Sequence, residues 1–271
     1  MRLRASVGKR HLVIPDTQCR PGVSLEHATW LGRYVAHQFM EGKGFDVIVH
    51  LGDLWDMPSL SSYDTAARKA YDRRSYLSDK QSGDEWLKRF HSELEVVKDS
   101  LLLDDCAFHL TTGNHENRAN IAVEKDPSLA EHISTDDVTG YASLLGWRVH
   151  PFLKPVTIDG IGFCHFFPLN ADGGVSNSRD GAPSAKAQAQ RARMSCTAGH
   201  KQGFDYAPLQ GQKPCHGLIA GSFYLHDEKY KTPQGNHHWR GVVVKNDVRQ
   251  GDYEICPVSM HYLYRRYRKP L

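Results

Sequence analysis

Three polar motifs, each directly after a short apolar run, constrain this chain more than any other feature of its sequence. They are Gly52-Asp53-Leu54-Trp55-Asp56, Gly113-Asn114-His115-Glu116 and Gly199-His200-Lys201-Gln202. Pro15-Asp16-Thr17-Gln18 ends an earlier apolar run, and His165 lies between the last two motifs. Side chains just past the carboxyl ends of buried strands project into the crevice where open α/β sheets bind ligands. The sequence therefore predicts that Asp16, Asp53 and Asn114 share one oxygen-rich pocket.

The first part of the chain has the pattern of a parallel α/β unit. Apolar runs at His11–Pro15, Phe45–Leu51 and Ala107–Thr112 predict three buried strands. Between the first two, Ser24–Met40 predicts a helix that Ser24 caps and that carries apolar residues on one face. A strand, a helix and a strand in this order predict a right-handed parallel crossover.

The rest of the chain adds helices and then hairpins. We expect helical pieces and loop at Pro58–Ser82, a helix at Asp84–Leu102 and mostly helix at Ala119–Leu145. Asp159-Gly160 predicts a tight hairpin turn between strands at 156–158 and 161–166. The Gly- and Ser-rich stretch 170–184 predicts a long loop. Three late strands are expected at Leu218–Leu225, Trp239–Lys245 and Tyr253–Val258.

The bulk composition favours a soluble globular protein. The 271 residues carry a net charge of +3, are 40% hydrophobic and show no interdomain linker, which predicts one domain over 1–271, with motifs at 11–202 and late strands and a basic tail at 203–271. The six cysteines form no C-x-x-C pair and are expected to be reduced thiols. No apolar stretch is long enough for a signal-peptide core or a membrane span, so we expect a cytoplasmic protein with no membrane partner.

The ordered motif series, from Leu12 to Gln202, resembles that of the calcineurin-like metallophosphoesterases. This resemblance implies a four-layer α/β/β/α sandwich of two mixed sheets. It also implies hydrolysis of phosphate mono- or diesters by a hydroxide that two divalent metal ions activate. The sequences of three segments are similar to those of family members carried by tailed bacteriophages and prophages: Val13–Gln18, Asp56–Tyr63 and Trp239–Gly241. No separate capping domain follows, so DNA-break repair nucleases match only in part.

The resemblance also assigns metal ligands by position. Asp53 corresponds to the carboxylate that bridges both ions, and the second ion would have Asn114, His165 and His200 as further ligands. The first ion would be held by Asp16, residue 18, Asp53 and residue 202. At 18 and 202 the family usually has histidines, in D-x-H and G-H-x-H, and this chain has Gln18 and Gln202.

Both replacements fall on one metal site. Amide oxygen is a harder and weaker ligand than imidazole, so the Gln18/Gln202 site should favour Mn or Mg, while the Asn114/His165/His200 site should favour Mn, Fe or Zn. We therefore hypothesise an unequal pair of ions. In the alternative interpretation, Gln18 and Gln202 are ordinary loop residues beside a dead first site, and His165 is a satisfied core histidine.

Two residues correspond to the family's catalytic groups. His115 would give a proton to the departing oxygen, and Asp56 would orient it; Asp56 could instead be a helix N-cap. Arg118, with Asn114, is the candidate for substrate binding, because its planar guanidinium suits a phosphate oxygen. A surface salt bridge is the alternative for Arg118.

The sequence leaves the ester open. A phosphoesterase for nucleotides or other small substrates is the first interpretation. The tail Tyr262–Lys269 interleaves aromatic residues with four cations, which suits nucleic acid and favours a nuclease as the second; a solvated tail is the alternative. The third interpretation is a weakened phosphoesterase fold that serves as a binding module. The sequence predicts no oligomeric state.

Overall fold

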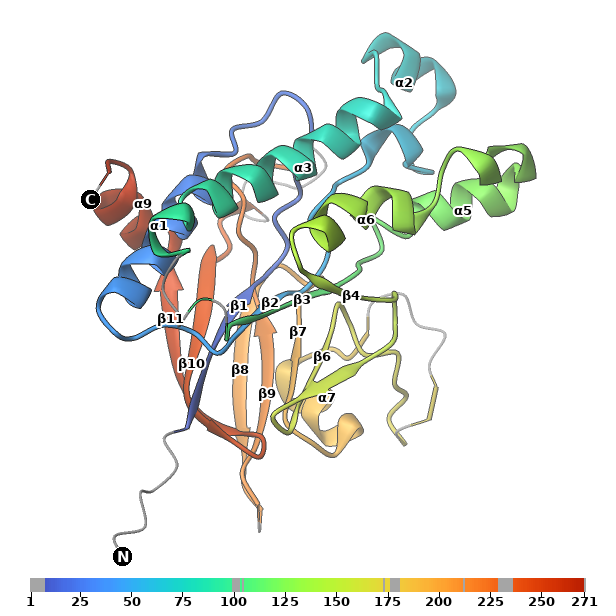
Figure 1. The fold of residues 1–271 in the computed structure, drawn as a ribbon. Coiled ribbons are helices and arrows are strands. Elements are labelled where there is room, and N and C mark those ends of the chain that lie inside the picture. The colour runs from blue at the N-terminus through green and yellow to red at the C-terminus, as the bar shows by residue number, and fades with distance from the viewer. Residues whose placement is uncertain are drawn as a thin grey trace, which may run out of the picture.

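Two β-sheets stacked face to face, with helices on their outer faces, make up the fold (Figure 1). This computed structural model describes residues 8–98, 103, 105–172, 174–175, 181–211, 213–228 and 236–270. The α/β class and the sandwich of two mixed sheets that the sequence predicted are confirmed. Every motif residue of interest lies within the described ranges.

The first sheet has six strands in the order β11-β10-β1-β2-β3-β4. Strands β1 to β4 are parallel, and β10 runs antiparallel to both β1 and β11. The strands are β1 (Lys9–Ile14), β2 (Val47–His50), β3 (Ala107–Thr111), β4 (Arg148–His150), β10 (Gly241–Arg249) and β11 (Asp252–Ser259). Because β1, β2 and β3 are parallel neighbours, the motifs that follow them emerge at the same edge of the sheet.

The second sheet has five strands in the order β5-β6-β7-β9-β8. They are β5 (Val156–Ile158), β6 (Ile161–Cys164), β7 (Cys196–Ala198), β8 (Phe204–Leu209) and β9 (Cys215–Ala220). The predicted hairpin is confirmed: Ile158 pairs with Ile161, and Asp159 (φ 49°) and Gly160 (φ 83°) both have the left-handed backbone of a tight two-residue turn. Strands β6 and β7 are parallel, so His165 and His200 also follow neighbouring strand ends.

Helices form the two outer layers. In Figure 1, α1, α3, α6 and α9 lie along the first sheet, and α7 packs on β8 and β9 of the second. The α-helices are α1 (Glu26–Met40), α2 (Ala66–Tyr71), α3 (Tyr76–Ser92), α5 (Arg118–Lys125), α6 (Thr135–Leu144), α7 (Ala185–Ala192) and α9 (Met260–Tyr267). Short 3-10 helices occupy η1 (Pro58–Leu60), η2 (Glu95–Val97) and η3 (Pro127–Glu131).

The side chains of β1 point alternately to two different cores, which explains the order of the layers. Leu12 and Ile14 belong to the core beneath the helices, whereas Val13 belongs to the core between the sheets, and all three are fully buried. A strand that is apolar on both faces must be covered on both faces. The first sheet is therefore an inner layer, and its carboxyl edge lies beside that of the second sheet.

Several predicted boundaries were wrong. Helix α1 begins at Glu26 after Leu25, which has no side-chain cap bond; Ser24 Oγ only accepts a 3.4 Å hydrogen bond from the Glu26 amide. The helix predicted at 84–102 is α3, which begins at Tyr76 behind its cap Ser75 and ends at Ser92. Residues 99–102, the end of the predicted range, are outside the described residues. The strand expected at 218–225 is β9, which ends at Ala220.

The tail is also different from a solvated segment. It forms α9, whose Leu263 and Tyr267 are buried against α1. In the part of the chain that the structure describes, no helix has both the length and the apolar character that crossing a bilayer requires.

Candidate metal centre

Five of the predicted site residues follow strand ends close to one cavity. Asp16 follows β1, Asp53 follows β2, Asn114 follows β3, His165 follows β6 and His200 follows β7. The cavity has a volume of about 220 Å³, and its lining is polar: Gln18, Asp53, Asn114, His115, His200, Lys201 and Gln202. Asp53 and Asn114, two of the three residues predicted to share a pocket, line this cavity, whereas Asp16 and His165 are not among its lining residues.

The loops at this edge hold unusual backbone conformations. Gln18, Asp53, His200 and Gln202 all have positive φ, between 45° and 67°. Non-glycine residues adopt this region rarely, and such residues cluster at functional sites because surrounding contacts must hold them. Here the Gln18 amide donates to the Asp53 carbonyl at 2.8 Å, and the His200 amide donates to Asp16 Oδ1 at 2.9 Å.

Two motif glycines are required by close approach to the carboxylates. A Cβ on Gly113 would lie 2.1 Å from Asp53 Oδ1, and a Cβ on Gly199 would lie 2.4 Å from Asp16 Oδ1. Real side chains do not tolerate such distances. The glycines of the second and third motifs thus let two loops pack directly on the two aspartates.

Asp53, Asn114, His165 and His200 form a compact donor cluster. Asn114 Oδ1 lies 2.9 Å from His165 Nε2 and 3.0 Å from His200 Nδ1, and Asp53 Oδ2 lies 3.3 Å from His165 Nε2. Ligand atoms of Asp53, His165 and His200 all lie within 4.8 Å of one another. This cluster could hold a metal ion, since one carboxylate and two imidazoles suit the transition metals.

Asp16 offers a further test of whether a cation fits. Its side chain is fully buried, and Oδ2 has no hydrogen-bond partner among the described residues. A buried carboxylate oxygen without a partner is costly unless a cation or a proton compensates it. The donor set therefore fits a divalent metal ion, with Asp16 Oδ2 as an additional oxygen ligand.

Protonation in this cluster follows from burial and crowded charge. Burial, with the nearby Asp53 carboxylate, raises the pKa of Asp16 to about 7. Burial alone would lower the pKa of His165, but Asp53 and Asp16 outweigh it and raise this pKa to about 10. Burial alone would raise the pKa of Asp53, and the neighbouring His115 and His165 instead hold it well below its ordinary value. Protons thus supply positive charge that a bound cation would replace.

Glu116 anchors the site, although the sequence assigned it no role. Its Oε1 accepts from the Leu54 and Trp55 amides at 2.7 and 3.1 Å. Its Oε2 accepts from the Asp53 and Gly113 amides at 3.0 and 2.7 Å. One fully buried carboxylate therefore ties the first two motifs together. Only its place three residues after Gly113 hinted at such a role.

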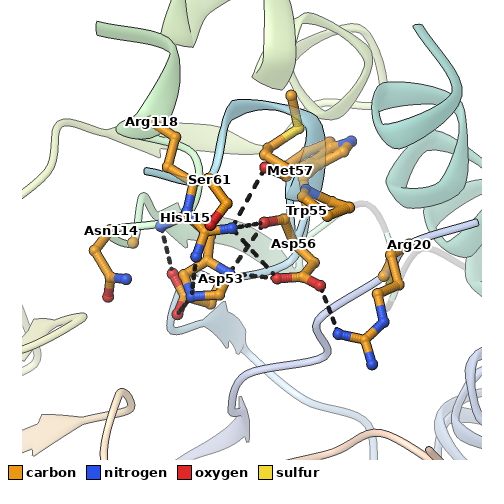
Figure 2. Close-up of polar contacts among 12 residues, drawn as sticks. Arg20, Asp53, Trp55, Asp56, Met57, Ser61, Asn114, His115 and Arg118 are labelled. Carbon is orange, nitrogen blue, oxygen red and sulfur yellow. Dashed lines mark hydrogen bonds and ion pairs between the residues drawn. The ribbon is translucent and has the colours of Figure 1, made fainter. Parts of the chain in front are cut away.

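His115 and Asp56 face each other, as predicted from their positions (Figure 2). His115 Nδ1 lies 2.7 Å from Asp56 Oδ1, and its Nε2 lies 3.6 Å from Asp53 Oδ2 at the cavity. Burial alone would lower the pKa of His115, but Asp53 and the contact with Asp56 raise it. Asp56 caps no described helix; η1 begins after Met57, whose side chain makes no cap bond.

Two arginines enclose Asp56. Arg20 donates to Asp56 Oδ2 at 2.9 Å and also to Glu228 at 3.1 Å (Figure 2). Arg118 donates to the Asp56 carbonyl at 2.5 Å and approaches His115 Nε2 at 3.2 Å. Arg118 Nη1 also lies 3.6 Å from Asp56 Oδ1, so its salt bridge is with a buried carboxylate. No sequence pattern pointed to Arg20 or Glu228, since their partners are distant in the chain.

The two glutamines also face the cavity. Gln18 and Gln202 both line it, and Gln202 Oε1 accepts a 2.9 Å hydrogen bond from the Tyr224 hydroxyl. The Tyr224 ring in turn lies under the Arg240 guanidinium, 4.8 Å from its centroid. Gln202 is thus oriented by a specific partner that sequence reasoning missed.

Comparisons with known proteins show a likeness in structure. No protein-family model matches the chain, and no curated protein matches it. Among solved structures, the crystal structure of the Pseudomonas putida nuclease MPE is similar, with a TM-score of 0.33 and 11% sequence identity; the match covers 92% of this chain and 87% of that one. What this chain does is therefore inferred from its own residues.

Proposed function

We propose that the chain is a metal-dependent phosphoesterase that hydrolyses phosphate mono- or diesters. The observation that carries this proposal is the cluster of Asp53, Asn114, His165 and His200 beside one cavity, next to a buried Asp16 oxygen that no described residue satisfies. Phosphoryl transfer needs cationic charge on the phosphoryl oxygens more than it needs covalent chemistry from the protein.

In this proposal Asn114, His165, His200 and Asp53 hold one divalent ion, and Asp53, Asp16, Gln18 and Gln202 hold a second. Such ions, when bound, lower the pKa of water and neutralise phosphoryl oxygens. The two shells are unequal, because the Asn114/His165/His200 shell has two imidazoles, whereas the Gln18/Gln202 shell has only oxygens. We therefore expect Mn, Fe or Zn at the Asn114/His165/His200 site and Mn or Mg, more weakly bound, at the Gln18/Gln202 site.

His115 would donate a proton to the leaving oxygen. Its Nδ1 faces Asp56, so its Nε2 is the ring atom available to the cavity. Asp56 fixes the orientation of the ring, and Arg20 and Arg118 hold Asp56 from two sides. Arg118 would also attract a phosphate oxygen, with the Asn114 amide beside it.

Metal content and turnover test this function. We expect protein purified without chelator to contain metal by elemental analysis, and to hydrolyse a chromogenic diester or monoester with Mn. Asp53→Asn should abolish turnover, whereas Asp105→Asn, a matched change at an exposed aspartate, should not. Silence with every metal and substrate, with one ion or none bound, would reject the enzyme and favour a binding module.

The role of His115 has its own test. General acid catalysis contributes roughly 10²- to 10⁴-fold, and only where the leaving group needs a proton. His115→Asn should therefore slow hydrolysis of an alkyl phosphodiester far more than hydrolysis of a p-nitrophenyl diester. Equal losses for both esters would contradict proton donation by His115.

A further inference from the structure

Helix α9 presents a strongly basic face that the metal centre does not use. The helix spans Met260–Tyr267 and begins at Ser259, whose Oγ accepts from the Tyr262 amide at 3.2 Å. His37 Nδ1 lies 3.0 Å from the Tyr267 hydroxyl, and Arg33 donates to the Tyr267 carbonyl at 3.1 Å. These contacts fix α9 against α1 (Figure 1). Its outer face is therefore rigidly presented.

The outer face carries positive charge that no acidic group balances. Four cations, all exposed, lie on or directly after the helix: Arg265, Arg266, Arg268 and Lys269. Among the described residues, none of the four has a carboxylate within salt-bridge distance. Compensation of the helix dipole would need one or two cations in the last turn. Four cations indicate a polyanionic partner.

Exposed aromatic rings lie among these cations. Tyr262 is 43% exposed and Tyr264 is 39% exposed. Tyr264 rests edge-on against Trp30 with ring centroids 5.1 Å apart, and the Arg268 guanidinium lies 5.0 Å from its centroid. Large rings held in place at a basic surface are the platforms on which unpaired bases stack.

From these features we propose that the outer face of α9 binds single-stranded nucleic acid. The cations would contact successive phosphates, and Tyr262 and Tyr264 would stack with bases. A membrane fits less well, because the apolar residues Leu263 and Tyr267 are already buried and cannot enter a bilayer. An acidic peptide would use the cations and leave the rings without a role.

The helix shares a wall with the metal centre. The Met260 amide donates to the Arg240 carbonyl at 2.8 Å. The Arg240 guanidinium covers the Tyr224 ring, and the Tyr224 hydroxyl donates to Gln202 at the cavity. The start of α9 is thus connected to the cavity wall through these contacts. That the bound strand is also a substrate rests on the proposed function, whereas the binding itself does not.

The test measures the affinity of metal-free protein, in chelator, for a fluorescent oligothymidine as salt rises from 50 to 200 mM. For single strands each neutralised phosphate contributes about 0.7 to the slope of log affinity against log salt. Four cations give a slope of about −2.8, so the fourfold rise in salt should weaken binding roughly 50-fold. Arg265→Gln with Arg266→Gln should reduce the slope by about 1.4.

A matched control removes two cations elsewhere. Lys186→Gln with Lys213→Gln makes the same change in net charge at exposed positions of α7 and of the connection between β8 and β9, and should leave the slope unchanged. Tyr262→Ala should weaken binding at least about fivefold without changing the slope. Both α9 variants should retain the thermal stability of the parent and its turnover of a small chromogenic diester.

Three results would overturn the proposal: no salt-dependent binding, equal losses in the control, or binding to phosphatidylserine vesicles but not to the oligonucleotide. Failure of the proposed function gives a different pattern. In that case the small diester is not hydrolysed with any metal, while oligonucleotide binding in chelator still depends on Arg265 and Arg266.

Discussion

Glu116→Gln is the substitution for which the structure gives the sharpest quantitative expectation. The carboxylate accepts four backbone hydrogen bonds, two at each oxygen, and all four donors belong to the loops that carry Asp53 and Gly113. Glutamine has the same shape but only one accepting oxygen. Whichever way its amide is turned, two buried N–H groups face an NH₂ group instead of an acceptor.

The cost follows from those two unsatisfied donors. A buried donor without a partner costs ~1–3 kcal/mol, so Glu116→Gln should lower the free energy of unfolding by roughly 2–6 kcal/mol. Small domains have total stabilities of about 5–15 kcal/mol. The effect should therefore be large, and urea unfolding of the metal-free protein, followed by tryptophan fluorescence and circular dichroism, measures it.

Metal affinity provides a second measurement for the same variant. Because Glu116 holds the Asp53 amide, its loss should displace the Asp53 carboxylate and weaken metal binding about 10- to 100-fold, as loss of a ligand's supporting partner does. Glu124→Gln, an isosteric change at an exposed position of α5, should alter stability by less than ~0.5 kcal/mol. A Glu116→Gln protein as stable as Glu124→Gln, with unchanged metal affinity, would refute this account of how the loops are held.

Three further predictions address the glutamines and the buried bases. Gln18→His with Gln202→His should tighten binding of Zn at the Gln18/Gln202 site at least ~10-fold, or ~1.4 kcal/mol, measured by competition with a chelator; two tightly held zinc ions in the parent would reject the unequal pair. Burial lowers the pKa of His27 from 6.5 to about 3, so the unfolded chain binds the extra proton and stability falls as pH drops below 6.5. His27→Gln keeps an acceptor for the Trp86 indole and should remove ~2 kcal/mol of the stability that the parent loses at pH 5. A variant whose urea midpoint falls from pH 7 to pH 5 as much as that of the parent would contradict this. Burial also lowers the pKa of Lys245 well below 10.5, so its contribution to stability grows as pH rises toward that value. Lys245→Met should raise stability at pH 7 and flatten its rise between pH 7 and 10 in urea titrations, and a variant that is less stable with the same pH slope would argue that Lys245 is charged when folded.

The position of the candidate site could be predicted because its signal is local. An apolar strand followed at once by a polar motif places that motif at a sheet edge, and parallel order brings such edges together. Asp53 and Asn114 line the same cavity, Asp16 Oδ1 accepts from the His200 amide, and the ligand atoms of Asp53, His165 and His200 lie within 4.8 Å of one another. A few consecutive residues are therefore enough to predict where each motif lies.

The groups that hold the site could not be predicted, because their partners come from elsewhere in the chain. Glu116 bonds to amides some 60 positions earlier, and Tyr224 bonds to Gln202 across a turn of the second sheet. Helix α3 was misplaced for a related reason. Gly83 interrupts its apolar pattern, yet a Cβ there would lie 2.2 Å from the Trp55 ring, so the glycine serves tertiary packing inside a continuous helix.

The cavity concentrates features that cost stability and that packing alone does not explain. Four non-glycine residues in the left-handed region, each costing about 1–3 kcal/mol, surround two buried aspartates whose charges repel each other. A divalent cation between the aspartates would convert their repulsion into attraction, and would give the orphaned Asp16 oxygen its missing partner. We therefore interpret these loops as a cation site whose strain lowers the stability of the metal-free protein. Glu116 holds the backbone of the strained loops in place through its hydrogen bonds to their amides.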